Sequence, residues 1–144
     1  MIIWGAATKS VAQNDYAVPK RMLSKSELKQ LQVVKDSILF QLRYIYNKEL
    51  KENSPGKYQP QRIALVREYL LLFQFINERL DVIGFTTKNV KDIVGPPDRI
   101  FDDDGYQIYE YTSLNRPYLK LKNLKYQLVF KNDELVFVHS KNNP

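Results

Sequence analysis

The spacing of hydrophobic residues predicts a helical first half of the chain. Ser24 and Glu27 fit a capping box, which marks a helix start. The residues Asn-Ser-Pro-Gly at 53–56 oppose helix continuation, so this helix is expected to end near Glu52. Between these signals, apolar residues recur every three or four positions, as in an amphipathic helix: Leu28, Leu31, Val34, Ile38, Leu42 and Ile45, a stripe that Phe40, Tyr44 and Tyr46 widen.

A second long helix is predicted from Pro60 to about Val82, because proline suits the first turn of a helix and Gly84 suits its end. Residues 24–83 are therefore expected to form a helical hairpin. A short third helix follows, with Thr86 or Thr87 as its N-cap. The residues Gly-Pro-Pro-Asp at 95–98 end it abruptly.

The pattern after residue 98 is that of β-strands. Apolar and polar residues alternate at 107–112 and again at 124–130, and the pair Asp104-Gly105 is a strong hairpin signal. A further turn is expected at Asn132-Asp133. The order of elements predicts an α+β fold, with two long N-terminal helices and a short helix packed on a three- to four-stranded antiparallel sheet. Residues 24–144 are interpreted as one domain.

The first 23 residues form a separate N-terminal segment. Residues 1–7 are apolar, and Ser10-Val11-Ala12 before Gln13 has the small-x-small pattern of a signal-peptidase site. One interpretation is the remnant of a secretory signal peptide whose start lies upstream. The alternative is an ordinary N-terminus with a short apolar anchor. No apolar run approaches the roughly 20 residues of a membrane-spanning helix.

Composition narrows the function classes. The 144 residues include no Cys and one His, His139, which excludes disulfides, thiolate metal sites and cysteine nucleophiles and leaves little room for a histidine-based centre. Asp102, Asp103 and Asp104 are consecutive, so a turn is favoured over a calcium loop, whose ligands alternate. No catalytic residue, metal ligand or cofactor is therefore predicted, and the protein is expected not to be an enzyme.

The net charge of +6 raises the alternative of a nucleic-acid-binding module. Most of the excess lies in residues 1–58, where it is scattered, so a solvated lysine-rich surface is the simpler explanation. The best case for nucleic acid is a surface on which bases stack on strand tyrosines. Its members would be Tyr109, Tyr111 and Tyr126, with Arg116, Lys120, Lys122 and Lys125 as phosphate contacts.

Residues 84–98 resemble the signature G-M-T-x-x-x-V-x-x-x-L-G-x-P of the BamE (SmpA/OmlA) family of small outer-membrane lipoproteins, which belong to the β-barrel assembly machinery. Residues 105–111 are similar to the first full strand of that family, and residues 128–136 to its closing hairpin. The resemblance covers about residues 80–140. It implies helices packed on an antiparallel sheet, as also in β-lactamase-inhibitor-like proteins, and a place in the periplasm or cell envelope. The lipidation cysteine of the family is absent.

These observations predict a non-enzymatic protein-binding domain of the bacterial cell envelope. Its partner is expected on an exposed sheet face and the adjoining loop, through side-chain types that often anchor interfaces. The predicted anchors are Tyr109, Tyr111, Arg116 and Tyr118. The alternatives are a cytoplasmic nucleic-acid-binding module and a soluble inhibitor or immunity-type protein.

Overall fold

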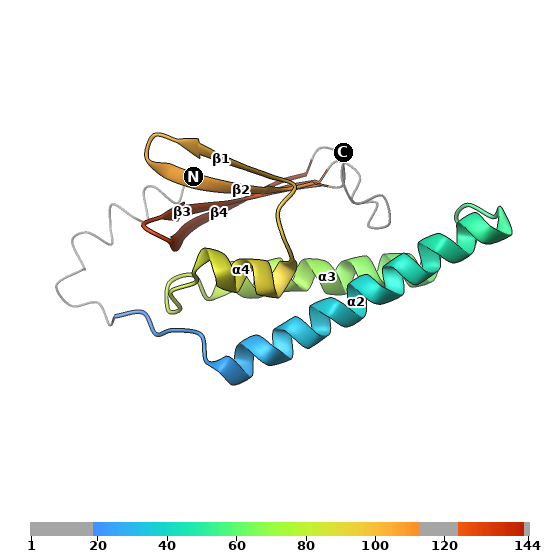
Figure 1. Cartoon of the computed structure of the whole chain (residues 1–144), viewed down its shortest axis with the longest axis horizontal. Helices are drawn as coiled ribbons and strands as arrows, with labels where there is room; N and C mark the ends of the chain where they lie inside the picture. The colour runs from blue at the N-terminus through green and yellow to red at the C-terminus, as the bar shows by residue number, and fades with distance from the viewer. Residues whose placement is uncertain (1–18, 113–123, 143–144) are drawn as a thin grey trace.

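The computed structural model describes residues 19–112 and 124–142. In this part of the chain, helices lie on one side of a four-stranded antiparallel sheet, so the predicted α+β fold is confirmed (Figure 1). The elements, in chain order, are α2 (Lys25–Glu52), α3 (Gln59–Glu78), α4 (Thr87–Val94), β1 (Arg99–Asp103), β2 (Tyr106–Tyr111), β3 (Leu124–Lys131) and β4 (Glu134–Asn142).

The helix ends follow the local chemistry of the sequence. Ser24 and Glu27 form the predicted capping box, in which each side chain accepts a backbone N–H of the other residue. Thr86 and Asn89 form a second one at the start of α4. The second helix ends at Glu78, earlier than the predicted Val82. The cause is a parallel β-bridge between Arg21 and residues 82–84. The N–H of Arg21 donates to the Val82 carbonyl, and the Arg21 carbonyl accepts the N–H of Gly84.

The sheet is a meander in which each strand pairs with the next in sequence. Two-residue turns join β1 to β2 and β3 to β4. Both turn residues have positive φ in each case, 52° and 84° at Asp104-Gly105 and 51° and 61° at Asn132-Asp133. Positive φ at both central residues is typical of the type I′ turn, whose twist matches that of the flanking antiparallel strands. Both predicted hairpin turns are confirmed.

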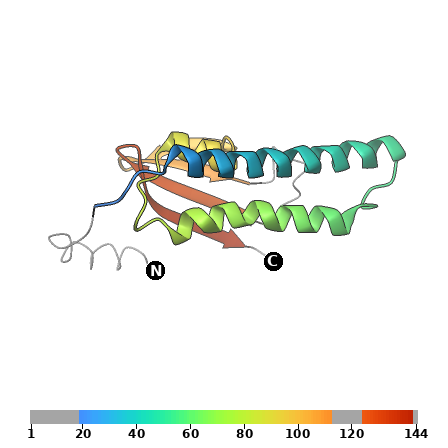
Figure 2. The ribbon, with the colours of Figure 1, turned by 90° about the horizontal axis from the view of Figure 1, so that it is seen from below.

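The hydrophobic core lies between the helices and the sheet. Leu42, Ile76 and Leu128 are fully buried there. Phe73 of α3 is the centre of an aromatic cluster: its ring stacks on Tyr126 at 4.2 Å and meets Tyr111 edge-to-face at 5.2 Å. Such pairs add to the stabilisation that burial alone provides. Helices α2 and α3 lie side by side and antiparallel over this core (Figure 2).

The C-terminal end of α4 is held by two buried tyrosine hydroxyls. Tyr69 donates to the Val94 carbonyl and Tyr111 donates to the Gly95 carbonyl, each at 2.7 Å. The last carbonyls of a helix have no partner within the helix, so buried ones need an external donor. One tyrosine comes from α3 and the other from β2, so α4 is fixed to both layers.

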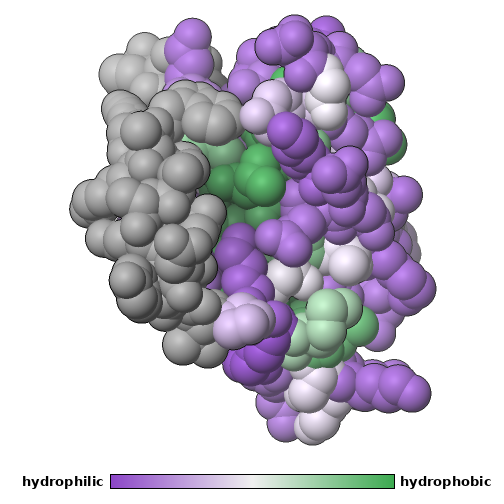
Figure 3. All heavy atoms as spheres, turned by 90° about the vertical axis from the view of Figure 1, so that its left-hand side faces the viewer, coloured by the Kyte–Doolittle hydropathy of each residue, from purple (hydrophilic) through white to green (hydrophobic). Residues whose placement is uncertain are grey.

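The surface at the end of the molecule where α2 begins is mostly hydrophilic, with small apolar patches between polar side chains (Figure 3). None of the described helices is long and apolar enough to span a lipid bilayer.

Candidate functional site

The predicted anchors on β2 do not lie on an exposed sheet face. Tyr109 and Tyr111 are each 2% exposed and point into the core beneath the sheet. The expectation that they lie at the surface is therefore wrong. Both faces of β2 carry apolar residues, so the alternation did not reveal which face the helices cover. The other two predicted anchors, Arg116 and Tyr118, lie outside the described residues.

The predicted platform for stacking bases is also absent from this part of the chain. Tyr126 is half-buried, and its ring already stacks on Phe73 with an interplanar angle of 7°. Burial of the hydroxyl raises the pKa of Tyr126. Tyr109 and Tyr111 are buried and one face of the Tyr126 ring is taken by Phe73, so the three tyrosines do not form the predicted exposed platform. The predicted phosphate contacts Arg116, Lys120 and Lys122 lie outside the described residues.

An exposed apolar stripe runs along α2 instead. Val33 is 54% exposed, Phe40 69% and Tyr44 59%. At 3.6 residues per turn these three lie on one side of the helix, opposite the buried Leu42, and extend over about 16 Å. The prediction that Phe40 and Tyr44 widen the buried stripe is therefore wrong. Plotting their positions around the helix axis would have placed them on the solvent side.

Basic side chains border this stripe. The spacing of residues along the helix places four cationic side chains and one carboxylate on the same side of α2: Lys29, Asp36, Arg43, Lys48 and Lys51. The carboxylate of Asp36 is paired with Lys35 at 3.0 Å. The exposed side of α2 therefore combines exposed apolar side chains with an excess of positive charge.

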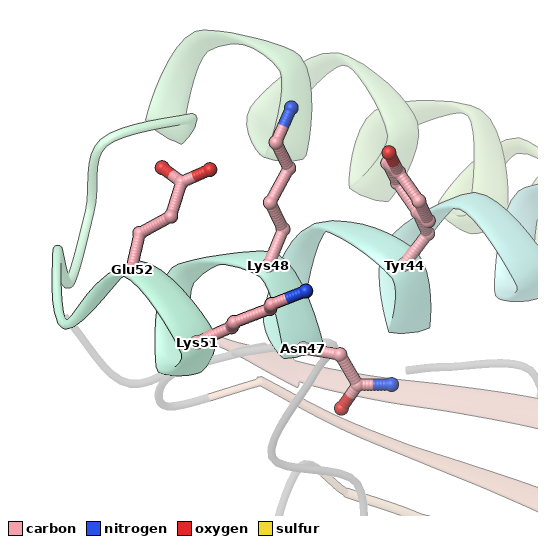
Figure 4. A pocket seen from close by; sticks show the side chains of 5 residues that line it. All are labelled: Tyr44, Asn47, Lys48, Lys51 and Glu52. Carbon is pink, nitrogen blue, oxygen red and sulfur yellow. The ribbon is translucent and has the colours of Figure 1, made fainter.

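The C-terminal end of the stripe contains an open depression of about 460 Å³, lined by Tyr44, Asn47, Lys48, Lys51 and Glu52. Tyr44, Lys48 and Glu52 project to one side of α2 and Asn47 to the other, with Lys51 extended between them (Figure 4). The ammonium of Lys48 lies 5.9 Å from the ring centre of Tyr44 and 4.9 Å from that of Tyr58. The aromatic rings thereby hold a cation at the rim of the depression.

The charges around the depression are fixed by their neighbours. The side chain of Tyr58, followed by that of Tyr44, raises the pKa of Lys48. Lys57 and the Tyr58 hydroxyl lower the pKa of Glu52, and Glu52 in turn raises the pKa of Lys57, to which it is bonded at 2.9 Å. Lys48, Glu52 and Lys57 therefore remain charged at neutral pH.

A buried ion pair holds the turn between α2 and α3 in place. Glu49 is 4% exposed and Arg62 2%, and their side chains are hydrogen-bonded to each other. Glu49 also accepts the backbone N–H of Tyr58 at 3.0 Å, and Arg62 donates to the Gln59 side chain. Both residues continue the buried side of their helices, Glu49 seven positions after Leu42 and Arg62 seven positions before Tyr69, so their angular positions could have revealed the pair in the sequence. It fixes the tip of the hairpin beside the depression.

The described residues contain no group of three or more His, Asp or Glu side chains that converge as metal ligands do. Asp102 and Asp103 are exposed on β1, and Asp104 lies in the turn after it. His139 is exposed on β4 beside Phe137, with ring centres 6.1 Å apart.

Comparison with protein families, curated proteins and solved structures gave no match to this chain. The resemblance of residues 80–140 to the BamE family therefore stays a prediction from the sequence.

Proposed function

We propose that this protein is a non-enzymatic protein-binding domain whose docking surface is the exposed side of α2. The observation that carries the proposal is the apolar stripe of Val33, Phe40 and Tyr44. Large apolar side chains more than half exposed, gathered on one side of a long helix, are typical of an interaction site rather than of a solvated surface.

The charge around the stripe supports an acidic partner. Lys29, Arg43, Lys48 and Lys51 border the stripe, and Asp36 is compensated by Lys35. A second copy of the chain would bring like charges together along the helix, which opposes self-association. An acidic segment with apolar residues on one side complements both properties, as when an amphipathic helix docks along another helix.

The bacterial cell envelope is the proposed location, and the support for it is the resemblance of residues 80–140 together with the signal-like pattern of residues 1–13. The protein-binding proposal does not depend on it, because α2 lies outside the resemblance.

The experiment is site-specific photo-crosslinking in extracts of the source cells. A photoreactive phenylalanine analogue replaces Phe40 in one variant and Leu71 in another. Leu71 is a matched control, because it is an apolar side chain that is 57% exposed but lies on α3, outside the stripe of α2. We expect an adduct with an acidic protein at position 40 and none at position 71.

One further variant, with two charges reversed, tests the chemistry. Adding Lys48→Glu and Lys51→Glu to the crosslinking variant should abolish the adduct, because the acidic partner would then meet like charge. Equal adducts at positions 40 and 71, or an adduct that survives the charge reversal, would refute the proposal. Crosslinking to nucleic acid, with steep loss as salt increases, would refute it in favour of the alternative function.

A further inference from the structure

The outer face of the sheet, which is the side turned away from the helices, carries a row of apolar side chains across all four strands. Cross-strand pairing aligns Phe101 with Ile108, Ile108 with Val129, and Val129 with Phe137. Their neighbours along the strands, such as Tyr109, are buried in the core. Because successive residues of a strand point to opposite faces, the apolar row lies on the outer face.

In the part of the chain that the structure describes, no helix lies over the outer face (Figure 1). Phe101, Ile108 and Val129 each remain partly exposed on it. An antiparallel sheet with one solvated face normally carries polar residues on that face. An apolar residue on every strand therefore favours a second layer over this face, because apolar faces are stable when they pack against another element.

One end of the outer face, on the side of the apolar row where β1 and β3 begin, is basic. Arg99, Lys125 and Lys141 lie there, at outward positions of β1, β3 and β4. The carboxylate of Glu110 is 8% exposed and lies 3.5 Å from Arg99 and 3.7 Å from Lys125. One carboxylate among three cations leaves this basic end with an excess of positive charge.

The opposite end of the outer face, next to the two hairpin turns, is acidic. Asp103 is exposed at the end of β1, Asp104 follows in the turn, and Glu134 begins β4. Glu134 is bonded to Lys20 at 3.3 Å, but neither Asp103 nor Asp104 has an ion-pair partner among the described residues. The two aspartates therefore give this acidic end a negative charge that the described part of the chain does not compensate.

A second copy of the chain complements this pattern when it is turned over about an axis along the apolar row. Each strand then lies over the same strand of the second copy, and the basic end of one copy covers the acidic end of the other. Arg99 faces Asp103 of the second copy, and symmetry makes this contact twice. An axis along the strands would instead set Asp103 opposite Glu134 of the second copy, which like charge opposes.

We propose that two copies of this chain stack their outer faces into a β-sandwich of two four-stranded sheets, with the apolar rows in contact and the basic ends over the acidic ends. Sheets packed in this way lie about 10 Å apart. Each copy contributes three rows of four outward residues, fewer than the roughly 20–30 residues of a standard interface. The dimer is therefore expected to dissociate at micromolar concentrations.

The dimer keeps the docking surface of α2 accessible in both copies. The helices lie on the far side of each sheet from the interface (Figure 1), so the two apolar stripes face outward in opposite directions. The inference goes beyond the proposed function and does not rest on it.

Sedimentation equilibrium of the full-length protein across the micromolar range tests the dimer. We expect the mass to rise reversibly from that of one chain toward that of two. The variant Ile108→Thr/Val129→Thr keeps β-branched residues on the strands but removes apolar contact area, so Kd should rise about tenfold or more. The matched control Leu71→Gln, on the exposed side of α3, should leave Kd unchanged. Far-ultraviolet circular dichroism verifies that each variant is folded.

A mixture of two charge variants tests the arrangement of the copies. Arg99→Glu alone opposes two carboxylates at both contacts, and Asp103→Lys alone opposes two cations, so each variant should dimerise about tenfold more weakly than the native protein. An equimolar mixture of the two variants should restore association, because each contact of the mixed dimer again joins opposite charges.

A chain that remains monomeric at every concentration would overturn the proposal. A dimer that Ile108→Thr/Val129→Thr does not weaken would also overturn it, since another surface would then join the copies. So would a mixture of the charge variants that associates no better than either variant alone, since the basic and acidic ends would then not face each other.

Discussion

Removal of the arginine from the buried ion pair at the hairpin tip should destabilise the protein strongly. In Arg62→Met the carboxylate of Glu49 loses its counter-ion in a site where Glu49 is only 4% exposed. Removing one member of such a pair costs about 3–5 kcal/mol, because a buried charge is left uncompensated. Glu49 still accepts the Tyr58 backbone N–H at 3.0 Å, so we expect a value near the lower end of this range.

Removing both charges together should cost much less. In the double variant Glu49→Gln/Arg62→Met no charge is buried, and the Gln side chain can still accept the Tyr58 N–H. Nε of Arg62 also has no hydrogen-bond partner in this structure, so the native pair carries a cost that the double variant removes. We expect the double variant to lie within about 1 kcal/mol of the native protein, since replacing a whole buried pair is often near neutral.

Urea unfolding, with Arg67→Met as a matched exposed control on α3, measures these differences. The control should change the free energy of unfolding by at most about 0.5 kcal/mol. In thermal unfolding, Arg62→Met should lower Tm by about 6–12 °C, at about 2–4 °C per kcal/mol for a chain of this size. If Arg62→Met behaves like Arg67→Met, or if the double variant is as unstable as the single one, the reasoning is refuted.

The same pair has a defined pH dependence. Burial by itself would raise the pKa of Glu49, but the Tyr58 N–H and the Arg62 guanidinium outweigh it, and the pKa is lowered. A lowered folded-state pKa means that the stabilisation is present above the normal glutamate range and is lost as the pH falls through the folded-state pKa. The stability difference between the native protein and Arg62→Met should therefore shrink on acidification.

Three further predictions concern the helix ends. Thr86→Ala should cost about 1 kcal/mol in urea unfolding through loss of the N-cap of α4, and an unchanged midpoint would contradict the assigned cap. Tyr69→Phe should also cost about 1 kcal/mol, because the Val94 carbonyl loses its buried donor; a neutral effect would show that water replaces the hydroxyl. Arg21, followed by Ser24, lowers the pKa of Glu27 from its ordinary value of 4.5 to about 2, so the contribution of the cap should be lost as the pH falls from about 4.5 toward 2. Side-chain NMR titration of Glu27 checks this, and a midpoint near 4.5 would contradict it.

Local signals in the sequence predicted most of the fold. The capping box at Ser24, the N-cap at Thr86, the Pro-Gly and Gly-Pro-Pro stops and the Asp-Gly turn act over a few residues, and each is found where the sequence placed it. The end of α3 was predicted too late, because it is decided by the pairing of residues 82–84 with Arg21. A contact between segments 60 residues apart leaves no local signal.

The candidate site was predicted less well, because it depends on which side of each element is covered. Tyr109 and Ile108 are both apolar, so alternation along β2 is compatible with either face being buried. Phe40 and Tyr44 are aromatic, and composition favours such residues in a core. Their exposure follows from their angular position on α2, where Leu42 on the opposite side is fully buried.

The order of the elements has a consequence for synthesis on the ribosome. All three helices precede the sheet, and 50 residues of the chain follow the end of α4. At a synthesis rate of about 5–20 residues per second, about 3–10 s pass between the synthesis of the helices and that of the last strand that covers them. During that interval Phe73 lacks Tyr111 and Tyr126, the rings it packs against in the finished protein. The inner side of α3 is therefore an exposed apolar surface during translation, which makes this helix the segment of the nascent chain that chaperones are expected to bind.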